Sequence, residues 1–433
     1  MLFLGKSILK ILLVFGTRPA AIKMAPVVKS LKKSGKFDVV VCVSAQHRQM
    51  LDSVLEVFEI KPDYDLNIMK PGQDLFDITT EVLLKIKPVL LQEKPDCVLV
   101  QGDTSTAISA SLSAFYLKIP VGHVEAGLRT YRHDSPWPEE LNRQIVGRIA
   151  QYHFAPTVLS QSHLLSENLN FKNILVTGNT VIDALLQVCE RLDKDKIFAE
   201  KTRAELLKNF PLSGQQTCGP LPCLSREGRD EIHSKDHANR PYILMTGHRR
   251  ENFGQGFLNI CEALKYLAQK YPDFDFIYPV HLNPNVQEPV YNLLGELKNI
   301  FLIPPLDYAP FIDLMRHCYL VMTDSGGIQE EAPSLGKPVI VLRDTTERPE
   351  AIDAGTVKLA GTSFENIVSY VSELIDRPEL YQTMSRAINP YGDGQAAQRI
   401  TNYLSEQLCL SQTQTQPHSQ TQITPENSPV SVS

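Results

Sequence analysis

The chain has 433 residues, which is too long for a single hydrophobic core and predicts two α/β domains. Hydrophobic residues make up 43% of it and charged residues 21%, as in an ordinary soluble globular protein. With a net charge of −6 there is no general basic face, so neither nucleic acid nor an anionic membrane is expected as a partner.

The two chain ends and the cysteines indicate the compartment. The apolar N-terminus is interrupted by Lys6 and Lys10 and is followed by no small-residue cleavage site, so we expect a first strand with a short leader rather than a signal peptide. No segment reaches the roughly 20 apolar residues that a membrane helix needs. The 8 cysteines form no CxxC pair, which predicts free thiols and a cytoplasmic location.

In chain order, the first half alternates apolar strand patterns with helical patterns. The predicted strands are Ile11–Phe15, Val39–Val43, Cys97–Val100, Pro120–Val124, Tyr152–Phe154 and Ile174–Val176. The predicted helices between them are Ala20–Ser34, Gln49–Phe58, Leu75–Lys87, Ser105–Tyr116 and Glu139–Ile149. Repeated strand–helix–strand units predict a parallel sheet covered on both faces.

The second half repeats this pattern, with predicted strands at Tyr242–Thr246, Phe274–Val280, Ile300–Ile303, Tyr319–Thr323, Pro338–Leu342 and Val357–Ala360. We therefore expect an N-terminal Rossmann-like domain over residues 8–178 and a C-terminal one over residues 179–388, with a ligand cleft between them. Residues 212–240 have no helical or strand periodicity and are predicted to be an inserted loop. Residues 411–433 are polar and of low complexity, and disorder is predicted there.

Polar residues follow the predicted strands of the first domain. Arg18 and Lys23 lie at the start of the first helix, where a cation opposes the helix dipole, so an anionic partner such as a diphosphate is favoured over a plain surface position. Asp103, Glu125 and Glu139 are expected at the same rim, and clustered carboxylates suit general acid–base chemistry. Asp103 as a helix cap and Glu139 as an i,i+4 partner of Arg143 are the structural alternatives.

The second domain offers a complementary set of groups. His248 follows its first strand beside two arginines, and is a candidate acid, base or phosphate ligand. The segment MTDSGGIQEE (322–331) predicts a strand, a Ser325-Gly326-Gly327 turn, and a helix that opens near Glu330 and Glu331. Such a turn presents backbone amides to an anion, and Glu331 is placed to accept from ribose hydroxyls.

Two further features complete the pattern of polar residues. A metal site at His123, Glu125, His133 and Asp134 matches no compact zinc spacing, so no metal is expected. Arg348 follows the next predicted strand after the Gly-Gly turn and joins Arg18, Lys23 and His248 as positive groups, while the carboxylates face the other end of the ligand. That division predicts a nucleotide-sugar as substrate.

The motifs together resemble a known family, the non-hydrolysing UDP-N-acetylglucosamine 2-epimerases, from about residue 8 to residue 408. They are GTRPAAIKMAP (16–26), AQHRQML (45–51), PVGHVEAGLRT (120–130), SPWPEELNR (135–143), GNTVIDAL (178–185), TGHRREN (246–252), YPVHLNPNV (278–286), MTDSGGIQEEAPSLGKPV (322–339), LRDTTERPEA (342–351) and NPYGDGQA (389–396). The resemblance implies a type-B glycosyltransferase, glycogen-phosphorylase-like architecture and a C-terminal helix within 389–408, at Gly394–Leu408, that returns to the first domain.

The resemblance also implies the reaction. UDP-N-acetylglucosamine and UDP-N-acetylmannosamine interconvert by elimination and re-addition of UDP through a glycal, with no cofactor, in a homodimer that supplies N-acetylmannosamine for surface polysaccharide. By motif match the catalytic positions are Asp103, Glu125, Glu139 and His248. The substrate-binding positions are Arg18, Lys23, Phe311, Ser325, Gly326, Gly327, Glu331 and Arg348. A second, regulatory UDP-N-acetylglucosamine is implied at Gln46, Gln49, Glu139, Arg250 and His281.

The chain departs from the family pattern at Ala20, where a glutamate is usual, and at Leu306, where some members have glutamine. Other functions remain open on the residues alone. A UDP-sugar glycosyltransferase of the same architecture would not require the three carboxylates in their motif context, and a non-catalytic nucleotide-sugar sensor could lose them. A hydrolysing epimerase–kinase would need an additional kinase domain, for which the chain is too short.

Overall fold

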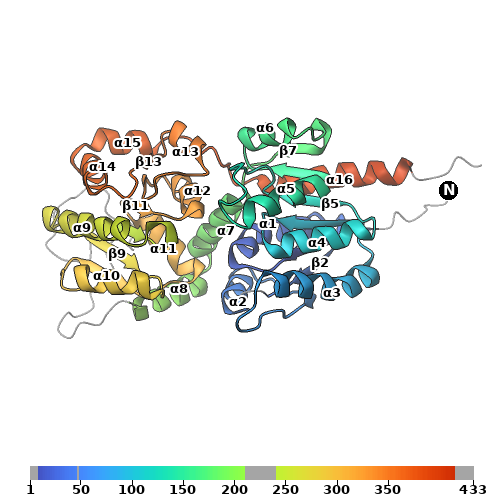
Figure 1. Cartoon of the computed structure of the whole chain (residues 1–433), viewed down its shortest axis with the longest axis horizontal. Helices are drawn as coiled ribbons and strands as arrows, with labels where there is room; N and C mark the ends of the chain where they lie inside the picture. Colours follow the sequence, from blue (N-terminus) through green and yellow to red (C-terminus); the bar gives the residue numbers. More distant parts are fainter. Residues whose placement is uncertain (1–7, 46–47, 210–239, 415–433) are drawn as a thin grey trace, which may run out of the picture.

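The structure, a computed structural model, describes residues 8–45, 48–209 and 240–414. Within these ranges the chain forms two parallel sheets with helices on both faces, each of Rossmann-like type, which confirms the predicted fold class. Figure 1 shows the two units side by side, with α7 (Thr180–Lys194) between them. The domain boundaries proposed from the sequence stay predictions.

The first sheet contains seven described strands in the order β3-β2-β1-β4-β5-β6-β7. Its strands are β1 (Leu9–Phe15), β2 (Phe37–Val43), β3 (Tyr64–Asp65), β4 (Cys97–Gln101), β5 (Val121–Val124), β6 (Tyr152–Ala155) and β7 (Ile174–Val176). Its helices are α1 (Arg18–Ser34), α2 (Arg48–Val57), α3 (Leu75–Glu93), α4 (Ser105–Tyr116), α5 (Glu139–Ile149), α6 (Val158–Ser166) and the short 3-10 helix η1 (Phe171–Asn173).

The second sheet contains six strands within residues 240–414, in the order β10-β9-β8-β11-β12-β13. Its strands are β8 (Tyr242–Thr246), β9 (Asp275–Pro279), β10 (Ile300–Ile303), β11 (Leu320–Thr323), β12 (Val339–Val341) and β13 (Val357–Leu359). The remaining helices are α8 (Lys196–Asn209), η3 (Arg250–Asn252), α9 (Gln255–Lys270), α10 (Pro284–Leu294), α11 (Tyr308–His317), α12 (Gly326–Ser334), α13 (Pro349–Asp353), α14 (Phe364–Asp376), α15 (Pro378–Ser385) and α16 (Ala396–Gln414).

Apolar runs and caps explain why these segments fold as they do. The central strands β1 and β4 are buried along almost their whole length, as expected for strands covered on both faces. Thr17 caps α1 at its start, and Gly35 ends it in the left-handed conformation at φ 64°. Each predicted strand is present within two residues of its expected bounds. The two-residue strand β3 was not predicted, because so short and polar a segment has no periodicity.

Besides α12, whose start is described with the site, two helices differ from their predicted bounds by more than two residues at one end. The third helix was expected to end at Lys87, before Pro88, but α3 continues to Glu93. Pro88 faces solvent while Val89 and Leu90 remain buried, so packing of the apolar face outweighs the missing backbone donor. The last helix begins at Ala396, not at Gly394, because Gly394 has a φ of 79° that is incompatible with a right-handed helix. It also continues past the predicted end at Leu408 to Gln414, so the disorder predicted from residue 411 is wrong for residues 411–414.

The two domains are joined where the chain crosses between them twice. Gly178 and Gly392 meet at this crossing, and a Cβ atom on Gly178 would lie 3.2 Å from the Cα atom of Gly392. The backbone amide of Asn179 donates to the carbonyl of Tyr391 at 2.7 Å. Helix α7 packs on α1 on one side and on α11 and α12 on the other. The C-terminal helix α16 lies against α1, the first helix of the chain (Figure 1).

The remaining sequence expectations concern the inserted loop, the C-terminal tail and membrane helices. The inserted loop, but for Arg240, and the tail from residue 415 lie outside the described residues. Among the described residues, the helices include none that is long and apolar enough to cross a membrane.

Candidate active site

Glu125 lies immediately beyond β5 with its side chain buried between the domains. It adopts a φ of 63°, which is unusual for a residue other than glycine and costs about 1–3 kcal/mol. Its carboxylate accepts hydrogen bonds from Lys23 on α1, from the Gln101 amide at the end of β4, and from the Asn179 amide at 2.8 Å. A strained and fully partnered carboxylate of this kind is typical of a functional position.

A second buried carboxylate, Glu330 on α12, lies beside the first. One oxygen of Glu330 accepts from Arg348 Nε at 2.5 Å, and the other accepts from Asn179 Nδ2 at 2.6 Å. Asn179 therefore donates to a carboxylate of each domain. We call Lys23, Glu125, Asn179, Glu330 and Arg348 the hinge cluster.

The charges of the hinge cluster balance one another. Burial by itself raises the pKa of Glu125, but Lys23, Arg348 and Asn179 outweigh it and hold that pKa below the usual value for a glutamate. Burial raises the pKa of Glu330 above its usual value, against the opposing effects of Arg348 and Lys23. For Lys23 the effect of burial is reversed by the two glutamates, which raise its pKa. Glu125 is therefore the carboxylate held in its ionised, basic form.

Neither Asp103 nor Glu139 has the purely structural role considered as its alternative, which was a helix cap for Asp103 and an i,i+4 ion pair for Glu139. Thr104, not Asp103, caps α4, and Asp103 Oδ2 instead accepts from Arg143 Nη2 at 2.6 Å. The structural alternative for Glu139, a pair with Arg143, is not formed, because Arg143 pairs with Asp103 and with the buried Glu140. Among the described residues Glu139 has neither a hydrogen bond nor an ion pair, so its half-buried carboxylate is available to a ligand.

His248 follows β8 and is held by Asp324 at the end of β11. The buried carboxylate of Asp324 accepts from the backbone amides of His248 and Arg249 at 2.7 and 2.8 Å, and one of its oxygens lies 3.3 Å from His248 Nδ1. Partial burial lowers the pKa of His248, against the pull of Asp324. The His248 ring stacks on that of His281, with centroids 5.5 Å apart. The imidazole is thus oriented for proton transfer or for a hydrogen bond.

The Ser-Gly-Gly segment is a helix terminus. Helix α12 begins at Gly326, four residues earlier than predicted, with Ser325 as its N-cap. The hydroxyl of Ser325 makes no capping hydrogen bond to the helix, so the first amides of α12 keep no side-chain acceptor from that residue. A Cβ atom on Gly326 would lie 2.5 Å from Arg348 Nη1, so the glycine allows the guanidinium to reach this terminus. The combination suits an anionic ligand.

The other predicted binding residues lie near this terminus or on the opposite domain. Glu331 Oε1 accepts from the Tyr308 hydroxyl at 2.8 Å, and burial raises the pKa of Glu331 to about 7. Arg18 Nη2 donates from the first domain to the carbonyl oxygen of Leu306 in the second, at 3.3 Å. Phe311 is half-buried on α11.

Of the predicted regulatory residues, Gln49 is exposed on the first turn of α2 and His281 is exposed after β9. Arg250 belongs to η3, next to the His248 loop. Gln46 lies outside the described residues.

His123 has a structural position. It is fully buried in β5, where its Nε2 donates to the carbonyl of Gly102 at 2.8 Å. Burial lowers its pKa to about 3, which keeps the ring neutral. Within the described residues, His, Cys, Asp and Glu form no cluster of three or more arranged to hold a metal.

Several site residues were missed by sequence reasoning. Asn179, Glu330, Gln101 and Asp324 were not singled out, although all four lie in motifs or at strand ends that were. Position at a strand's carboxyl end was the available signal for Gln101 and Asp324. For Asn179 and Glu330 it was only their place in two motifs, because their contact joins residues 151 positions apart.

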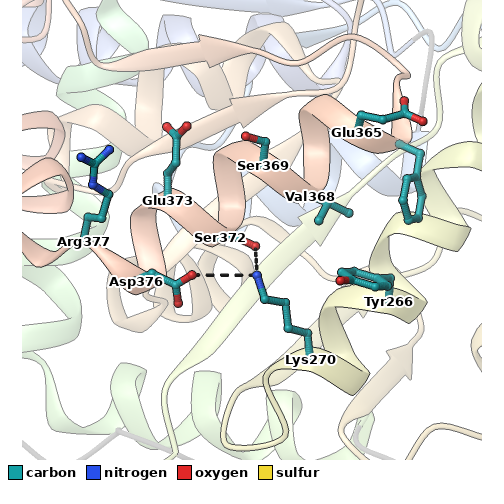
Figure 2. A pocket seen from close by; sticks show the side chains of 10 residues that line it. Tyr266, Lys270, Glu365, Val368, Ser369, Ser372, Glu373, Asp376 and Arg377 are labelled. Carbon is teal, nitrogen blue, oxygen red and sulfur yellow. Dashed lines mark hydrogen bonds and ion pairs between the residues drawn. The ribbon is translucent and has the colours of Figure 1, made fainter.

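A surface pocket of about 510 Å³ lies elsewhere, between α9 and α14. Figure 2 shows Lys270 among its lining residues, hydrogen-bonded to Ser372 at 2.9 Å and near Asp376. It is an open hollow lined by mixed charges and contains none of the site residues described above. We therefore place the active site at the carboxyl ends of the two sheets.

Comparison with known proteins shows the family of the chain. A family model described as UDP-N-acetylglucosamine 2-epimerase matches residues 29–212 and 222–405. The UDP-N-acetylglucosamine 2-epimerase of Escherichia coli K12 is 54% identical over 396 residues, which cover 92% of this chain and 98% of that protein. The Salmonella typhimurium enzyme of the same name is 55% identical over 396 residues, with the same coverage.

Two solved structures are similar throughout. The crystal structure of the Neisseria meningitidis UDP-GlcNAc 2-epimerase bound to UDP-GlcNAc is 50% identical, with a TM-score of 0.80 and coverage of 92% of this chain and 100% of that one. The Methanocaldococcus jannaschii enzyme in complex with UDP-GlcNAc and UDP is 32% identical, with a TM-score of 0.73 and the same coverage.

The hinge cluster generates a stability prediction. Lys23→Met leaves the buried Glu125 without its cation and is expected to lower the free energy of unfolding by about 3–5 kcal/mol. Adding Glu125→Gln removes the uncompensated charge, so the double variant should be more stable than Lys23→Met alone. Urea unfolding followed by circular dichroism measures both, with the exposed Lys33→Met as a control. Lys23→Met of unchanged stability would contradict the pairing.

Proposed function

The chain belongs to the UDP-N-acetylglucosamine 2-epimerase family and is an isomerase, and we propose that it interconverts UDP-N-acetylglucosamine and UDP-N-acetylmannosamine by elimination and re-addition of UDP. The observation that carries the mechanism is the buried, ionised Glu125 on the first domain, together with the helix terminus and Arg348 on the second. A base and an anion site brought together from two domains suit a substrate with an acidic carbon near a diphosphate.

In the proposed forward step a carboxylate removes the proton from carbon two of the sugar. The electron pair forms a double bond between carbons one and two, and the bond from carbon one to the diphosphate oxygen breaks with its electrons leaving on UDP. The products of this half-reaction are a glycal and UDP. Re-addition of UDP to carbon one and of a proton to the opposite face of carbon two gives the epimer. Atoms and charge balance without a redox cofactor.

Glu125, Asp103, Glu139 and His248 are proposed to act on the sugar. Glu125 is supported as the base by its buried position at the carboxyl end of β5 and by its lowered pKa, which keeps the carboxylate ionised and able to accept a proton. Glu139 is supported as a second proton-transfer group because its carboxylate has no partner among the described residues, and Asp103 is fixed by Arg143 at the same rim. His248, oriented by Asp324, is proposed to interact with the leaving oxygen of UDP.

The second domain is proposed to bind the UDP part. The amides at Ser325, Gly326 and Gly327 and the guanidinium of Arg348 are suited to the diphosphate. Lys23 has three N–H donors, and Glu125 uses only one of them, so donors remain for a phosphate oxygen. Further proposed contacts are the ribose at Glu331, the base near Phe311 and the phosphate at Arg18.

A second UDP-N-acetylglucosamine is proposed to bind beside the first and to favour the closed arrangement of the domains. Its contacts come from both domains: Gln46, Gln49 and Glu139 on one side, Arg250 and His281 on the other. The stacking of His281 on His248 supports the proposal, because a ligand that touches one ring also fixes the other. Binding across both domains stabilises the closed state in preference to the open one.

We also propose that the enzyme is a homodimer whose product supplies N-acetylmannosamine for surface polysaccharide. The dimer is supported by an exposed apolar surface on α3 and α4, where Phe76, Leu84, Phe115 and Tyr116 are each more than half exposed. These two helices pack side by side, so both belong to the same side of the first domain.

The first functional prediction concerns the base. Glu125→Gln keeps the shape and most hydrogen bonds of the side chain but cannot accept the proton, so turnover should fall by roughly 100-fold or more, the usual size of a general acid–base contribution. Coupled detection of UDP-N-acetylmannosamine measures turnover, and thermal unfolding shows that the variant is folded. Near-normal epimerisation in this variant would remove Glu125 from the mechanism.

The second concerns the diphosphate. Arg18→Ala and Arg348→Ala each remove a charge-assisted contact and should weaken UDP binding by about tenfold or more in isothermal titration calorimetry. Arg377→Ala is the control, because Arg377 is exposed and pairs only loosely with Glu379 at 3.6 Å. If both site variants bound UDP as tightly as the native enzyme, the diphosphate would have to bind elsewhere.

The third concerns regulation. Pure UDP-N-acetylmannosamine should react with a lag that traces of UDP-N-acetylglucosamine abolish, since the product is the activator. His281→Ala should remove the lag, because the accumulating UDP-N-acetylglucosamine no longer activates the enzyme and the progress curve no longer accelerates. Progress curves of the native enzyme that are linear from the first measurement would reject the second site.

A further inference from the structure

The hinge cluster contains two residues to which the proposed reaction gives no part, Asn179 and Glu330. Both side chains are almost fully buried, at 2% and 1% exposure, and the Asn179 amide lies between the carboxylates of Glu125 and Glu330. Each polar atom of the two side chains already has a partner within the protein. Their arrangement points to control of the base rather than to a contact with substrate.

The orientation of the Asn179 amide is fixed by its surroundings. Its Oδ1 accepts from the backbone amide of Val181 at 3.1 Å, and a backbone amide can only donate. The Nδ2 group must therefore face the other way, where its two hydrogens meet Glu125 Oε1 at 2.8 Å and Glu330 Oε2 at 2.6 Å. All the hydrogen-bonding groups of the Asn179 side chain are in use.

The bridge joins the two domains at the crossing of the chain between them. Asn179 is the N-cap of α7 at this crossing, Glu125 directly follows β5 of the first sheet, and Glu330 belongs to α12 of the second domain. Two like charges in a buried site repel unless a donor lies between them. Glu330 is in turn fixed by Arg348, whose guanidinium reaches the start of α12. A change at the anion site is thereby connected to Glu125 through two side chains.

We propose that Asn179 and Glu330 are positioning residues that hold Glu125 in its reactive orientation by clamping it to helix α12 of the second domain. This inference rests on the proposed role of Glu125 as the base. Asn179 supplies the amide that both carboxylates share, and Glu330 anchors that amide to Arg348. The base is then correctly placed only when α12 is docked, so that chemistry is tied to the docked arrangement of the domains.

The alternative role for Asn179 is that of a helix cap alone, and one substitution separates the two. Asn179→Asp keeps the size of the side chain and the oxygen that accepts from Val181, and a carboxylate is a good cap at a helix start. It lacks the Nδ2 donors and adds a third negative group facing Glu125 and Glu330. A residue that only caps α7 would tolerate this change.

We expect Asn179→Asp to lower kcat by about 100-fold with KM and UDP affinity changed little, because the hydrogen bond lost is one to a charged group and is replaced by repulsion. Asn179→Ser keeps a capping oxygen without adding charge and should lower kcat by about tenfold. The Asn179→Ser variant also tests the proposal if the Asn179→Asp variant does not fold. Asn170→Asp makes the same change at the exposed cap of η1 and should retain native kcat.

The role of Glu330 is tested by exchanging the amide and the carboxylate between positions 179 and 330. In Asn179→Asp/Glu330→Gln the added carboxylate is offset by the one removed. The amide of the introduced glutamine can donate to the introduced aspartate, and its oxygen can still accept from Arg348. This double variant should recover about tenfold of the kcat lost in Asn179→Asp, a non-additive effect expected only for side chains in contact.

The outcomes separate the inference from the function on which it rests. Native kcat in both Asn179→Asp and Asn179→Ser, alongside an inactive Glu125→Gln, would overturn the clamp and leave the mechanism intact. Native turnover in Glu125→Gln would instead remove the base itself. A double variant no faster than Asn179→Asp would overturn the part assigned to Glu330. Calorimetry with UDP on every variant confirms that the anion site is folded.

Discussion

The structure depends on one constraint: two carboxylates and two cations are buried together where the domains meet. Charges of this kind are stable away from water only when each is paired and hydrogen-bonded. Glu125 is paired with Lys23 from α1, and Glu330 is paired with Arg348. The Asn179 amide joins the pairs. Because the partners come from both sheets and from the chain crossing, the relative position of the domains is set by the same contacts that prepare the site.

This arrangement explains how the work is divided between the domains. The first sheet presents carboxylates at its carboxyl ends, and the second presents a helix terminus, a guanidinium and an oriented imidazole. A proposed glycal intermediate is reactive toward water, so both halves must enclose it until UDP returns. Since neither domain holds all of the proposed catalytic and binding groups, the proposed reaction requires the two domains to come together.

Sequence reasoning was most successful where short-range patterns decide the outcome. Apolar runs between turn residues predicted the strands of both sheets, except for the two polar residues of β3. It was less successful where tertiary packing decides. Pro88 did not end its helix, the helix after Ser325 starts at Gly326, and Arg143 pairs with Asp103 rather than with Glu139. Asn179 and Glu330 could not have been joined from sequence, because only the folded chain brings them together. The assigned roles of the site residues remain predictions.

The most direct test of the central claim is epimerisation in heavy water. Native enzyme is incubated with UDP-N-acetylglucosamine in deuterium oxide, and the product is analysed by proton NMR and mass spectrometry. Proton removal at carbon two followed by return from a group that exchanges with solvent predicts one deuterium at carbon two of UDP-N-acetylmannosamine, and deuterium in recovered substrate as the reaction approaches equilibrium. Product that retains the original hydrogen at carbon two throughout would contradict the account.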